Sequence, residues 1–342
     1  MVITPPDKKE TAMTCFTQGV RQAMAFTLVF GSVLPAMDAA QAADWPTKPV
    51  RILVGAPPGG TADIVARLVA RELQAPLGQP VIVDYKPGAG GTIAVQSMLS
   101  SPRDGYTFLL IQKGIASEVP HAIKVSYDPF KDIVPIAQLT QYGLVLVGNP
   151  NLPARNVGEL VRYIKSKPGK IDYANFGVGT RGQTMGVQFN RLAGLDAGTV
   201  SYKGSPAALQ DVMGGQVPLM FDGPATSLPF IKSGKLRAFA VASPRRMAAL
   251  PDVPTFTESG YPDLHDVSWM GIWSAQGVPP AVIAKMRDAT LKVTQSPALR
   301  PRLEEMGMEP GSPATTEELL KDVRESYERQ GALLRSINFT PD

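Results

Sequence analysis

Apolar and polar positions follow one pattern most clearly at the start of the folded part of the chain. Val50–Val54 is an apolar run that predicts a buried strand, and a Pro-Pro-Gly-Gly turn follows at residues 57–60. Apolar residues then return at helical spacing; Thr61 is expected to cap this helix, and Asp63 lies in its first turn. Such a strand–turn–helix unit offers free backbone N–H groups to an anion such as a carboxylate, although an ordinary βα connection has the same pattern.

The pattern recurs along the next fifty residues. A strand is predicted at 80–83, a second glycine turn at 86–91, a helix at 92–99 and a strand at 106–111. This alternation is typical of an α/β protein with a mainly parallel sheet and helices on its faces. Ligands of such sheets bind beyond the carboxyl ends of the strands, where both glycine turns are expected.

A second α/β series is predicted in the middle of the chain. Residues 112–143 are expected to be irregular, and a strand at 144–147 leads to a linker in which Asn156 caps a helix. Later elements are predicted as strands at 171–174, 199–202, 217–221, 236–242 and 269–273, helices at 183–193, 205–213, 225–233, 280–294, 297–306 and 316–334, and a loop at 243–266.

The first residues have the pattern of an export signal. Arg21 precedes the apolar run 23–34, which is too short to span a membrane, and Ala40–Ala42 supplies small residues for cleavage. We therefore expect residues 1–43 to be a signal peptide, cleaved near Ala42 or Ala43, with Met13 as an alternative start.

The cysteine content and net charge of the chain restrict the classes of function that it can have. The single cysteine, Cys15, lies before the apolar run, so the exported chain is expected to contain no disulfide and no cysteine nucleophile or ligand. The net charge is +4, but the charges are scattered without a basic run. This argues against nucleic acid as a partner and is compatible with an anionic ligand.

Residues 177–182 match G-x-G-x-x-G between a predicted strand and a predicted helix. The next predicted strand ends in Val-Ser-Tyr rather than in an acidic residue, which argues against a dinucleotide site. We interpret the turn as a second backbone cradle, to which Asn175 and Thr180 add side-chain donors. Arg181 adds a charge suited to a carboxylate, or is simply a solvated surface arginine.

Two further strand-to-helix junctions carry Ser205 and Asp222, which either contact a ligand or cap helices. Trp269 and Trp273 are expected in the core. His121 and the chain's other histidine, His265, lie in predicted loops, and the sequence has no G-x-S-x-G or H-E-x-x-H motif. The sequence therefore offers few residues that could support nucleophilic or zinc catalysis.

Five stretches carry a resemblance over the whole expected mature chain: WPTKPVRILVGAPPGGTADIVAR, KPGAGGTIA, KPGKIDYANFGVGT, VSYKGSPAALQDVMGGQVPLMFDGPATSLPFIKSGKLRAFAVASPRR and LPDVPTFTESGYP. In this order they resemble the extracytoplasmic solute-binding proteins of tripartite tricarboxylate transporters, the TctC-like or Bug family. The resemblance implies a two-lobed type II periplasmic-binding-protein fold with the ligand cleft between the lobes. It implies a first lobe of residues 44–144 plus 267–342 and a second lobe of residues 145–266.

The resemblance also implies a ligand site made by the first glycine turn, the facing turn of the second lobe and the Asp222 junction. With the residues singled out above, the predicted ligand-binding set is Pro58, Gly59, Gly60, Thr61, Asp63, Asn175, Gly177, Gly179, Thr180, Arg181, Ser205 and Asp222. Phe176 and Arg181 are bulkier than is usual in the family, and Gly223 replaces a polar residue. We hypothesise that Arg181 pairs with a second ligand carboxylate and that Phe176 lies against an apolar part of the ligand.

The sequence thus predicts a periplasmic, monomeric capture protein for a small organic anion, expected to be a carboxylate. It would deliver its ligand to separate membrane permease subunits, without cofactor, metal or catalysis. Two alternatives stay open at this stage. An exported enzyme on the same scaffold would turn its ligand over, whereas a ligand sensor would alter transcription rather than uptake.

Overall fold

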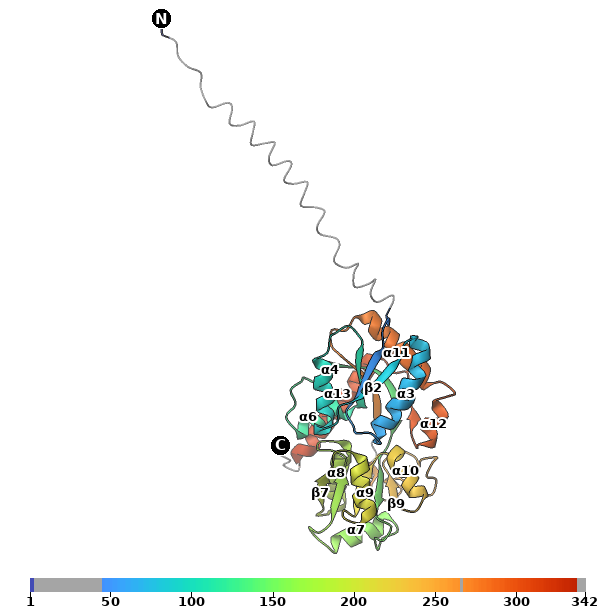
Figure 1. Ribbon diagram of the computed structural model, residues 1–342. Helices are drawn as coiled ribbons and strands as arrows, with labels where there is room; N and C mark the ends of the chain where they lie inside the picture. The colour runs from blue at the N-terminus through green and yellow to red at the C-terminus, as the bar shows by residue number, and fades with distance from the viewer. Residues whose placement is uncertain (3–44, 265–266, 337–342) are drawn as a thin grey trace. The chain divides into compact units, whose positions relative to one another are not determined.

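The computed structural model of the protein describes residues 1–2, 45–264 and 267–336. By its contacts the chain divides into a first unit, residues 1–45, and a compact second unit, residues 46–342. The predicted signal peptide and its cleavage site lie almost wholly outside the described residues, as does His265. The second unit contains the helices and strands described below (Figure 1).

Six of the described strands form the first sheet, in the order β11-β4-β10-β3-β1-β2. They are β1 (Val50–Val54), β2 (Val81–Tyr85), β3 (Thr107–Gln112), β4 (Ile133–Tyr142), β10 (Ser268–Ala275) and β11 (Glu309–Pro310). Strands β1, β2 and β3 are parallel, whereas β10 is antiparallel to β3 and β4 is antiparallel to β10.

The second sheet contains five of the described strands in the order β7-β6-β8-β5-β9. They are β5 (Val145–Gly148), β6 (Asp172–Asn175), β7 (Gly198–Ser201), β8 (Leu219–Asp222) and β9 (Arg237–Val241). Strands β6, β7 and β8 are parallel, and β5 runs antiparallel to its neighbours β8 and β9. We call the parts of the chain built on the two sheets the first and second lobes.

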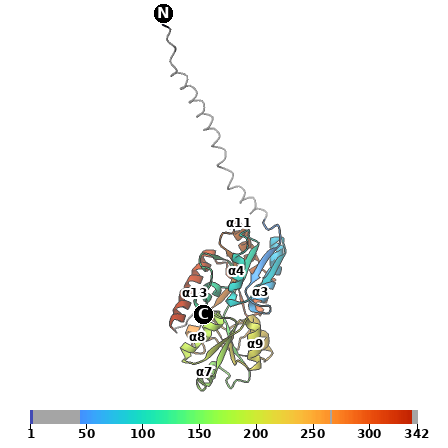
Figure 2. The same ribbon diagram turned by 60° about the vertical axis from the view of Figure 1, so that its left-hand side comes forward.

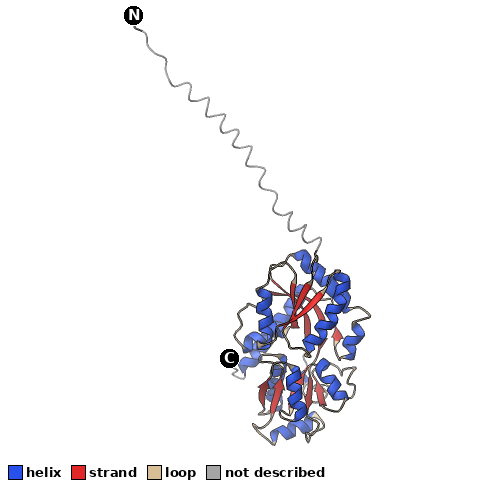
Figure 3. Ribbon diagram, in the orientation of Figure 1, coloured by secondary structure: helices blue, strands red, loops and turns tan. Residues whose placement is uncertain are grey.

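Helices cover both faces of each sheet (Figure 3). Those of the first lobe are α3 (Thr61–Leu77), η1 (Ala89–Gly91), α4 (Thr92–Leu99), α5 (Gly114–Ser117), α6 (Val119–Ala122), α11 (Pro280–Thr294), α12 (Arg300–Glu305) and α13 (Thr316–Ser336). Those of the second lobe are α7 (Val157–Lys165), α8 (Arg181–Ala193), α9 (Ser205–Gly214) and α10 (Pro224–Lys232); η2 (Pro262–Leu264) lies in the segment that leads back to the first sheet. Figure 2 shows α3 and α13 on opposite sides of the first lobe.

Each lobe has its own hydrophobic core. In the first lobe, Leu53, Leu109, Trp269 and Trp273 pack with residues of α4, α5 and α13. The two indole rings stack at 5.3 Å between centroids, which confirms that both tryptophans belong to the core. The second core joins the central strands to α9 and α10. The sheets are therefore rigid supports for the loops at their edges.

The sheets are mainly parallel, as predicted: β1 to β4 run in one direction in the first sheet, and β6 to β9 in the second. Each sheet also contains a strand entered from the other lobe that runs the opposite way, β10 and β5, and these reversals were not predicted. The reason for them lies where the chain crosses between lobes. Strands β4 and β5 are separated only by Gly143 and Leu144, and β9 leads back to β10. A chain that passes from one sheet into the other without a crossover helix enters it antiparallel to the βαβ strands.

Three local predictions are corrected. Residues 112–143 are not irregular, because they contain α5, α6 and the ten-residue strand β4. His121 lies in α6 rather than in a loop, and its Nε2 is 2.9 Å from the Tyr327 carbonyl oxygen. Thr61 is the first residue of α3 and not its cap, because Gly60 occupies that position. Asn156, by contrast, caps α7 as predicted by accepting the Glu159 N–H at 2.9 Å.

The strands of the first sheet fall within residues 44–144 and 267–342, and those of the second within residues 145–266. The lobe boundaries themselves stay a prediction. Among the described residues, no helix has the length and apolar character needed to cross a membrane.

Candidate ligand site between the lobes

Three helices begin at the carboxyl ends of parallel strands and face the space between the lobes. Helix α3 follows β1, α9 follows β7 and α10 follows β8. They surround a cavity of about 310 Å³. Its lining residues come from both lobes: Gly55, Ala56, Pro57, Gly60, Thr61, Ala62, Gly88, Ala89, Gly90, Gly91, Ile111, Gln112, Ile123, Tyr142, Leu144, Phe176, Gly177, Val178, Thr180, Ser201, Tyr202, Lys203, Gly204, Ser205 and Gly223.

The first glycine turn is held in shape by the fully buried carboxylate of Asp63. One oxygen accepts the Gly59 N–H at 2.7 Å and lies 2.8 Å from Arg67 Nη2, while the other accepts the Tyr85 hydroxyl at 2.5 Å. Burial, together with this bond to Asp63, raises the pKa of Tyr85. Gly59 has φ +82°, a conformation that side chains oppose. The turn is therefore built around Asp63, not around a ligand.

This frame leaves the start of α3 open to the cavity. The first N–H groups of an α-helix have no acceptor within the helix. Thr61 and Ala62 line the cavity, and the helix dipole makes their N–H groups favourable partners for an anion.

On the second lobe, Asp222 organises the starts of α9 and α10. Its two oxygens accept the hydroxyls of Ser205 and Thr226, each at 2.6 Å. Burial raises the pKa of Asp222 to about 6, although these hydrogen bonds oppose the rise. The cap residues of α9 and α10 are Gly204 and Gly223, so the alternative that Ser205 and Asp222 cap these helices is wrong.

The two lobes are in contact around this end of the cavity. Gly204 has φ +114°, and a Cβ there would collide with Pro57 of the other lobe. A Cβ on Gly223 would lie 2.5 Å from Thr61 Oγ1, and Thr61 Oγ1 is 3.3 Å from Thr226 Oγ1. The helix starts of the two lobes thus lie in direct contact through small side chains, as they would in a closed binding protein.

The facing turn of the second lobe is held by bonds within itself. Asn175 Oδ1 accepts the Gly177 N–H at 3.1 Å, and Thr180 Oγ1 donates to the Gly177 carbonyl at 2.6 Å. The Gly179 N–H donates to Gln183 Oε1 at 2.7 Å. Phe176 and Thr180 are left to line the cavity.

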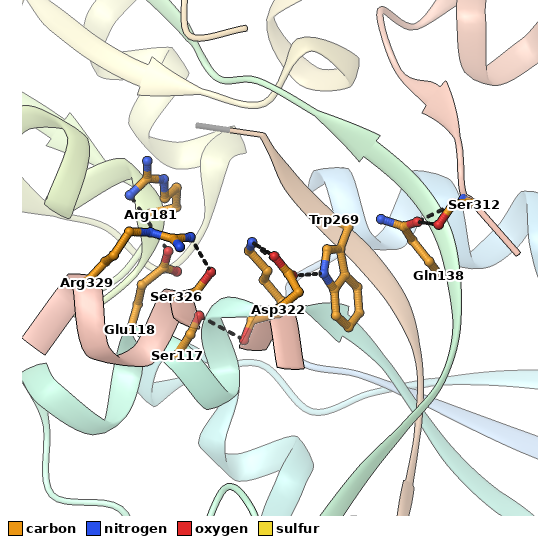
Figure 4. A network of polar contacts seen from close by, with 10 residues as sticks. Ser117, Glu118, Gln138, Arg181, Trp269, Ser312, Asp322, Ser326 and Arg329 are labelled. Carbon is orange, nitrogen blue, oxygen red and sulfur yellow. Dashed lines mark hydrogen bonds and ion pairs between the residues drawn. The ribbon is translucent and has the colours of Figure 1, made fainter. Parts of the chain in front are cut away.

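Arg181 is buried, with 5% of its surface exposed, so the alternative of a solvated surface arginine is wrong. Its Nη1 lies 3.9 Å from Oε1 of Glu118, a first-lobe residue that is 1% exposed (Figure 4). Both residues line a side cavity of about 20 Å³ that shares Phe176 with the main cavity. The contact of Arg181 with a second ligand carboxylate stays a prediction.

Five of the predicted ligand-binding residues line the cavity: Gly60, Thr61, Gly177, Thr180 and Ser205. The others do not line it. Gly59, Asp63, Asn175, Gly179 and Asp222 belong to the frames described above, Arg181 contacts Glu118, and Pro58 is exposed in the first turn. Direct ligand contact by these residues remains a prediction.

Sequence reasoning missed several lining residues. Gly90 and Gly91 belong to the second glycine turn, whose place at the strand ends was a usable signal. Lys203 follows the Tyr202 junction and is the one charged side chain among the lining residues. Gln112 and Tyr142 end strands β3 and β4, and Tyr142 was hidden because β4 was not predicted.

A larger cavity of about 840 Å³ lies where the chain crosses between the lobes. Its lining charges include Arg245 and Glu309, which form an ion pair at 2.5 Å, and none of α3, α9 and α10 begins there. The smaller cavity is the better candidate site because helix starts of both lobes converge on it. Among the described residues, no three histidine, cysteine or acidic side chains gather as a metal site would require.

The geometry is that of a two-lobed α/β binding protein with helix N-termini and a lysine around a cavity between the lobes. The sequence matches the tripartite tricarboxylate transporter family receptor, TctC, over residues 65–339. The chain belongs to this family, which consists of solute-binding proteins and not of enzymes.

Two curated relatives illustrate the match. A UPF0065 protein of Bordetella bronchiseptica is 34% identical over 328 residues, or 94% of this chain and 96% of the relative. The protein BugT of Bordetella pertussis is 34% identical over 261 residues, or 75% of this chain and 79% of the relative.

Solved structures agree with the fold. The periplasmic binding protein BugD is 31% identical with a TM-score of 0.82, covering 87% of this chain and 100% of its own. Two proteins of Rhodopseudomonas palustris are also similar: Rpa4515 with adipate (28% identity, TM-score 0.84, 87% and 100% covered) and MatC with bound malate (29%, 0.81, 85% and 100%). These neighbours share the two-lobe fold, which confirms the predicted fold class.

Proposed function

We propose that this receptor captures a small organic carboxylate in the periplasm, after cleavage of its signal peptide, and delivers it as a monomer to the permease subunits of its transporter. One observation carries the proposal: a cavity between the lobes onto which the starts of α3, α9 and α10 open from both sides. Backbone N–H groups at helix N-termini form charge-assisted hydrogen bonds with a carboxylate, and enclosure strengthens them by excluding water.

The charges around the cavity support an anionic ligand. Lys203 is the one charged side chain among its lining residues. The carboxylates of Asp63 and Asp222 hold the first glycine turn and the helix starts in shape but do not line the cavity. The similar proteins solved with adipate and malate hold carboxylates, which favours the same chemical class here. Contact between the lobes at Thr61 and Thr226 supports capture by closure.

A thermal-shift panel tests the proposal. The purified protein is unfolded and refolded to remove any bound ligand, and is then heated with mono-, di- and tricarboxylates, with sugars and amines as controls. A ligand at one hundred times its Kd stabilises the folded state by about 2.7 kcal/mol. For a protein of this size that corresponds to roughly 5 °C or more in Tm. A panel in which no carboxylate raises the Tm would overturn the proposal.

A further inference from the structure

We infer that Glu118 is a specificity-determining residue. By neutralising Arg181 at one end of the cavity, it makes the site prefer a monocarboxylate with an apolar body over a dicarboxylate of the same length. This inference rests on the proposed function, because it names the class of carboxylate that the same cavity takes.

The two ends of the cavity differ in chemistry. At the helix-start end, defined by Gly60, Thr61, Lys203, Ser205 and Gly223, the lining combines the starts of helices with one lysine. At the apolar end, defined by Ile111, Leu144, Phe176 and Val178, aliphatic and aromatic groups make up much of the wall, which the polar side chains of Gln112, Tyr142 and Thr180 complete.

A side cavity adjoins the apolar end and not the helix-start end. The side cavity of about 20 Å³ shares Ile111, Leu144 and Phe176 with the main cavity. Its lining includes none of the residues that define the helix-start end.

Arg181 stands behind the apolar end, where it would be the natural partner of a second ligand carboxylate. It is instead paired with Glu118, and the side chains of Arg181 and Glu118 are only 6% and 2% exposed. Figure 4 shows the two side chains pointing toward each other, beside Arg329 and Ser326 of α13. The guanidinium and the carboxylate together carry no net charge.

A second ligand carboxylate at this end would have to give up its hydration. It would then lie near Arg181, which is already paired with Glu118, and near the Glu118 carboxylate, which would repel it. The desolvation cost of a buried charge is repaid only by a well-placed opposite charge. An apolar body, in contrast, gains from contact with Phe176 and its neighbours.

The test compares hexanoate with adipate, two acids of the same chain length that differ only in the far carboxylate. Calorimetric titration of the refolded wild-type protein should give hexanoate at least about tenfold tighter binding than adipate. Phenylacetate should also bind more tightly than succinate. If adipate binds as tightly as hexanoate or more tightly, the inference is overturned while the proposed function stands. If no acid binds, the proposed function itself fails.

The variant Glu118→Gln tests the role of the residue directly. It leaves Arg181 without its neighbouring carboxylate, so the ratio of adipate to hexanoate affinity should rise by about tenfold. Because an uncompensated buried arginine can weaken folding, the double variant Glu118→Gln/Arg181→Gln is measured beside it. The double variant, which lacks the guanidinium as well, should show no gain in the ratio of adipate to hexanoate affinity over the wild type.

Glu305→Gln is the matched control, because it removes one exposed acidic charge outside the cavity. It should leave the affinity ratio unchanged. A ratio that shifts equally in Glu118→Gln and Glu305→Gln would show a general charge effect and would contradict the assignment. So would a double variant that gains adipate affinity as the single variant does.

Discussion

The two glycine turns that face each other across the cavity are held by different means. The turn of the first lobe is fixed by Asp63, which is fully buried and bonds to Gly59 within the turn and to Tyr85 on the neighbouring strand. The turn of the second lobe is held internally by Asn175, but the helix that follows it begins with Arg181, whose ion pair lies in the other lobe.

Because they are held differently, the two turns are expected to play different roles in ligand binding. The first turn is complete within one lobe, so it can present the start of α3 before the lobes close. The start of α8 gains its contact with Glu118 only when the lobes are together. We therefore expect the first turn to contribute affinity for a carboxylate in the open protein, and the contact between Arg181 and Glu118 to add closure and choice among carboxylates.

The largest combined effect on stability and binding is expected from Asp63→Ala. The change removes a buried carboxylate and leaves the exposed Gly59 N–H and the half-buried Tyr85 hydroxyl without their acceptor, which should lower the free energy of unfolding by about 2 kcal/mol. Ligand affinity should also fall by more than about tenfold, because the start of α3 is no longer held in place. Urea unfolding and ligand titration measure the two effects.

Arg67→Ala is the control for this variant. It removes the ion pair with Asp63 but keeps both hydrogen bonds, and the Arg67 side chain is 61% exposed. Its cost should be within about 1 kcal/mol. Equal losses in Asp63→Ala and Arg67→Ala would mean that the ion pair, and not the turn frame, holds the first lobe's site.

The second effect concerns pH and the second lobe. Asp222 has a pKa of about 6 in the folded protein, above its ordinary value of 3.8, because burial disfavours its charge. Between these values the folded state keeps a proton that the unfolded state has released. Stability contributed by protonated Asp222 is therefore full below about pH 4 and lost as the pH rises to about 6, by up to about 3 kcal/mol.

Asp222→Asn should remove this part of the pH dependence of the free energy of unfolding. Asp288→Asn, which changes an exposed carboxylate of α11, should retain it. Unfolding by urea at intervals from pH 4 to pH 7 makes the comparison. Wild-type and Asp222→Asn profiles that run parallel through this range would contradict the assignment.

The third effect is expected from Phe176→Ala at the apolar end. Truncation removes the ring that lines the cavity, so affinity for phenylacetate should fall by about tenfold. Affinity for acetate, which is too short to need that wall, should change little. Phe230→Ala, a half-buried phenylalanine that packs on the same core outside the cavity, is the control. Similar losses for both acids would show that Phe176 acts through folding.

Much of the fold could be predicted because its signals are local. Parallel strands β1, β2 and β3 and the helices after them follow apolar runs and glycine turns. Strand β4 was missed because prolines favoured a loop. Pro135 pairs with Trp273 of β10 next to an irregularity in the register, while β11 reaches only Thr140 and Gln141. Proline is tolerated there because its missing N–H falls on an unpaired edge.

The residues of the candidate site likewise fall into those that local sequence patterns predict and those that they do not. Gly60 and Thr61 could be predicted because strand, turn and helix follow each other in the chain. The partner of Arg181 could not, because Glu118 lies 63 residues earlier and no local pattern joins them. The frame roles of Asp63 and Asp222 were also hidden, since spacing alone does not distinguish a carboxylate that holds a turn from one that meets a ligand.

The smallest effect, expected from Lys203→Gln, distinguishes two contributions to the helix-start end. Lys203 is exposed, so its attraction to a carboxylate is screened by water and by salt. Hexanoate affinity should fall about threefold at low ionic strength, and the difference from wild type should vanish at about 0.5 M salt. Lys170→Gln, an exposed lysine of the same lobe outside the cavity, should bind as the wild type does. The backbone N–H groups of α3 lie inside the enclosed cavity, so the affinity that remains should depend little on salt. A loss in Lys203→Gln that persists undiminished at high salt would instead mean that the ammonium is enclosed with the ligand when the lobes close, and that the first turn is not the main source of carboxylate affinity.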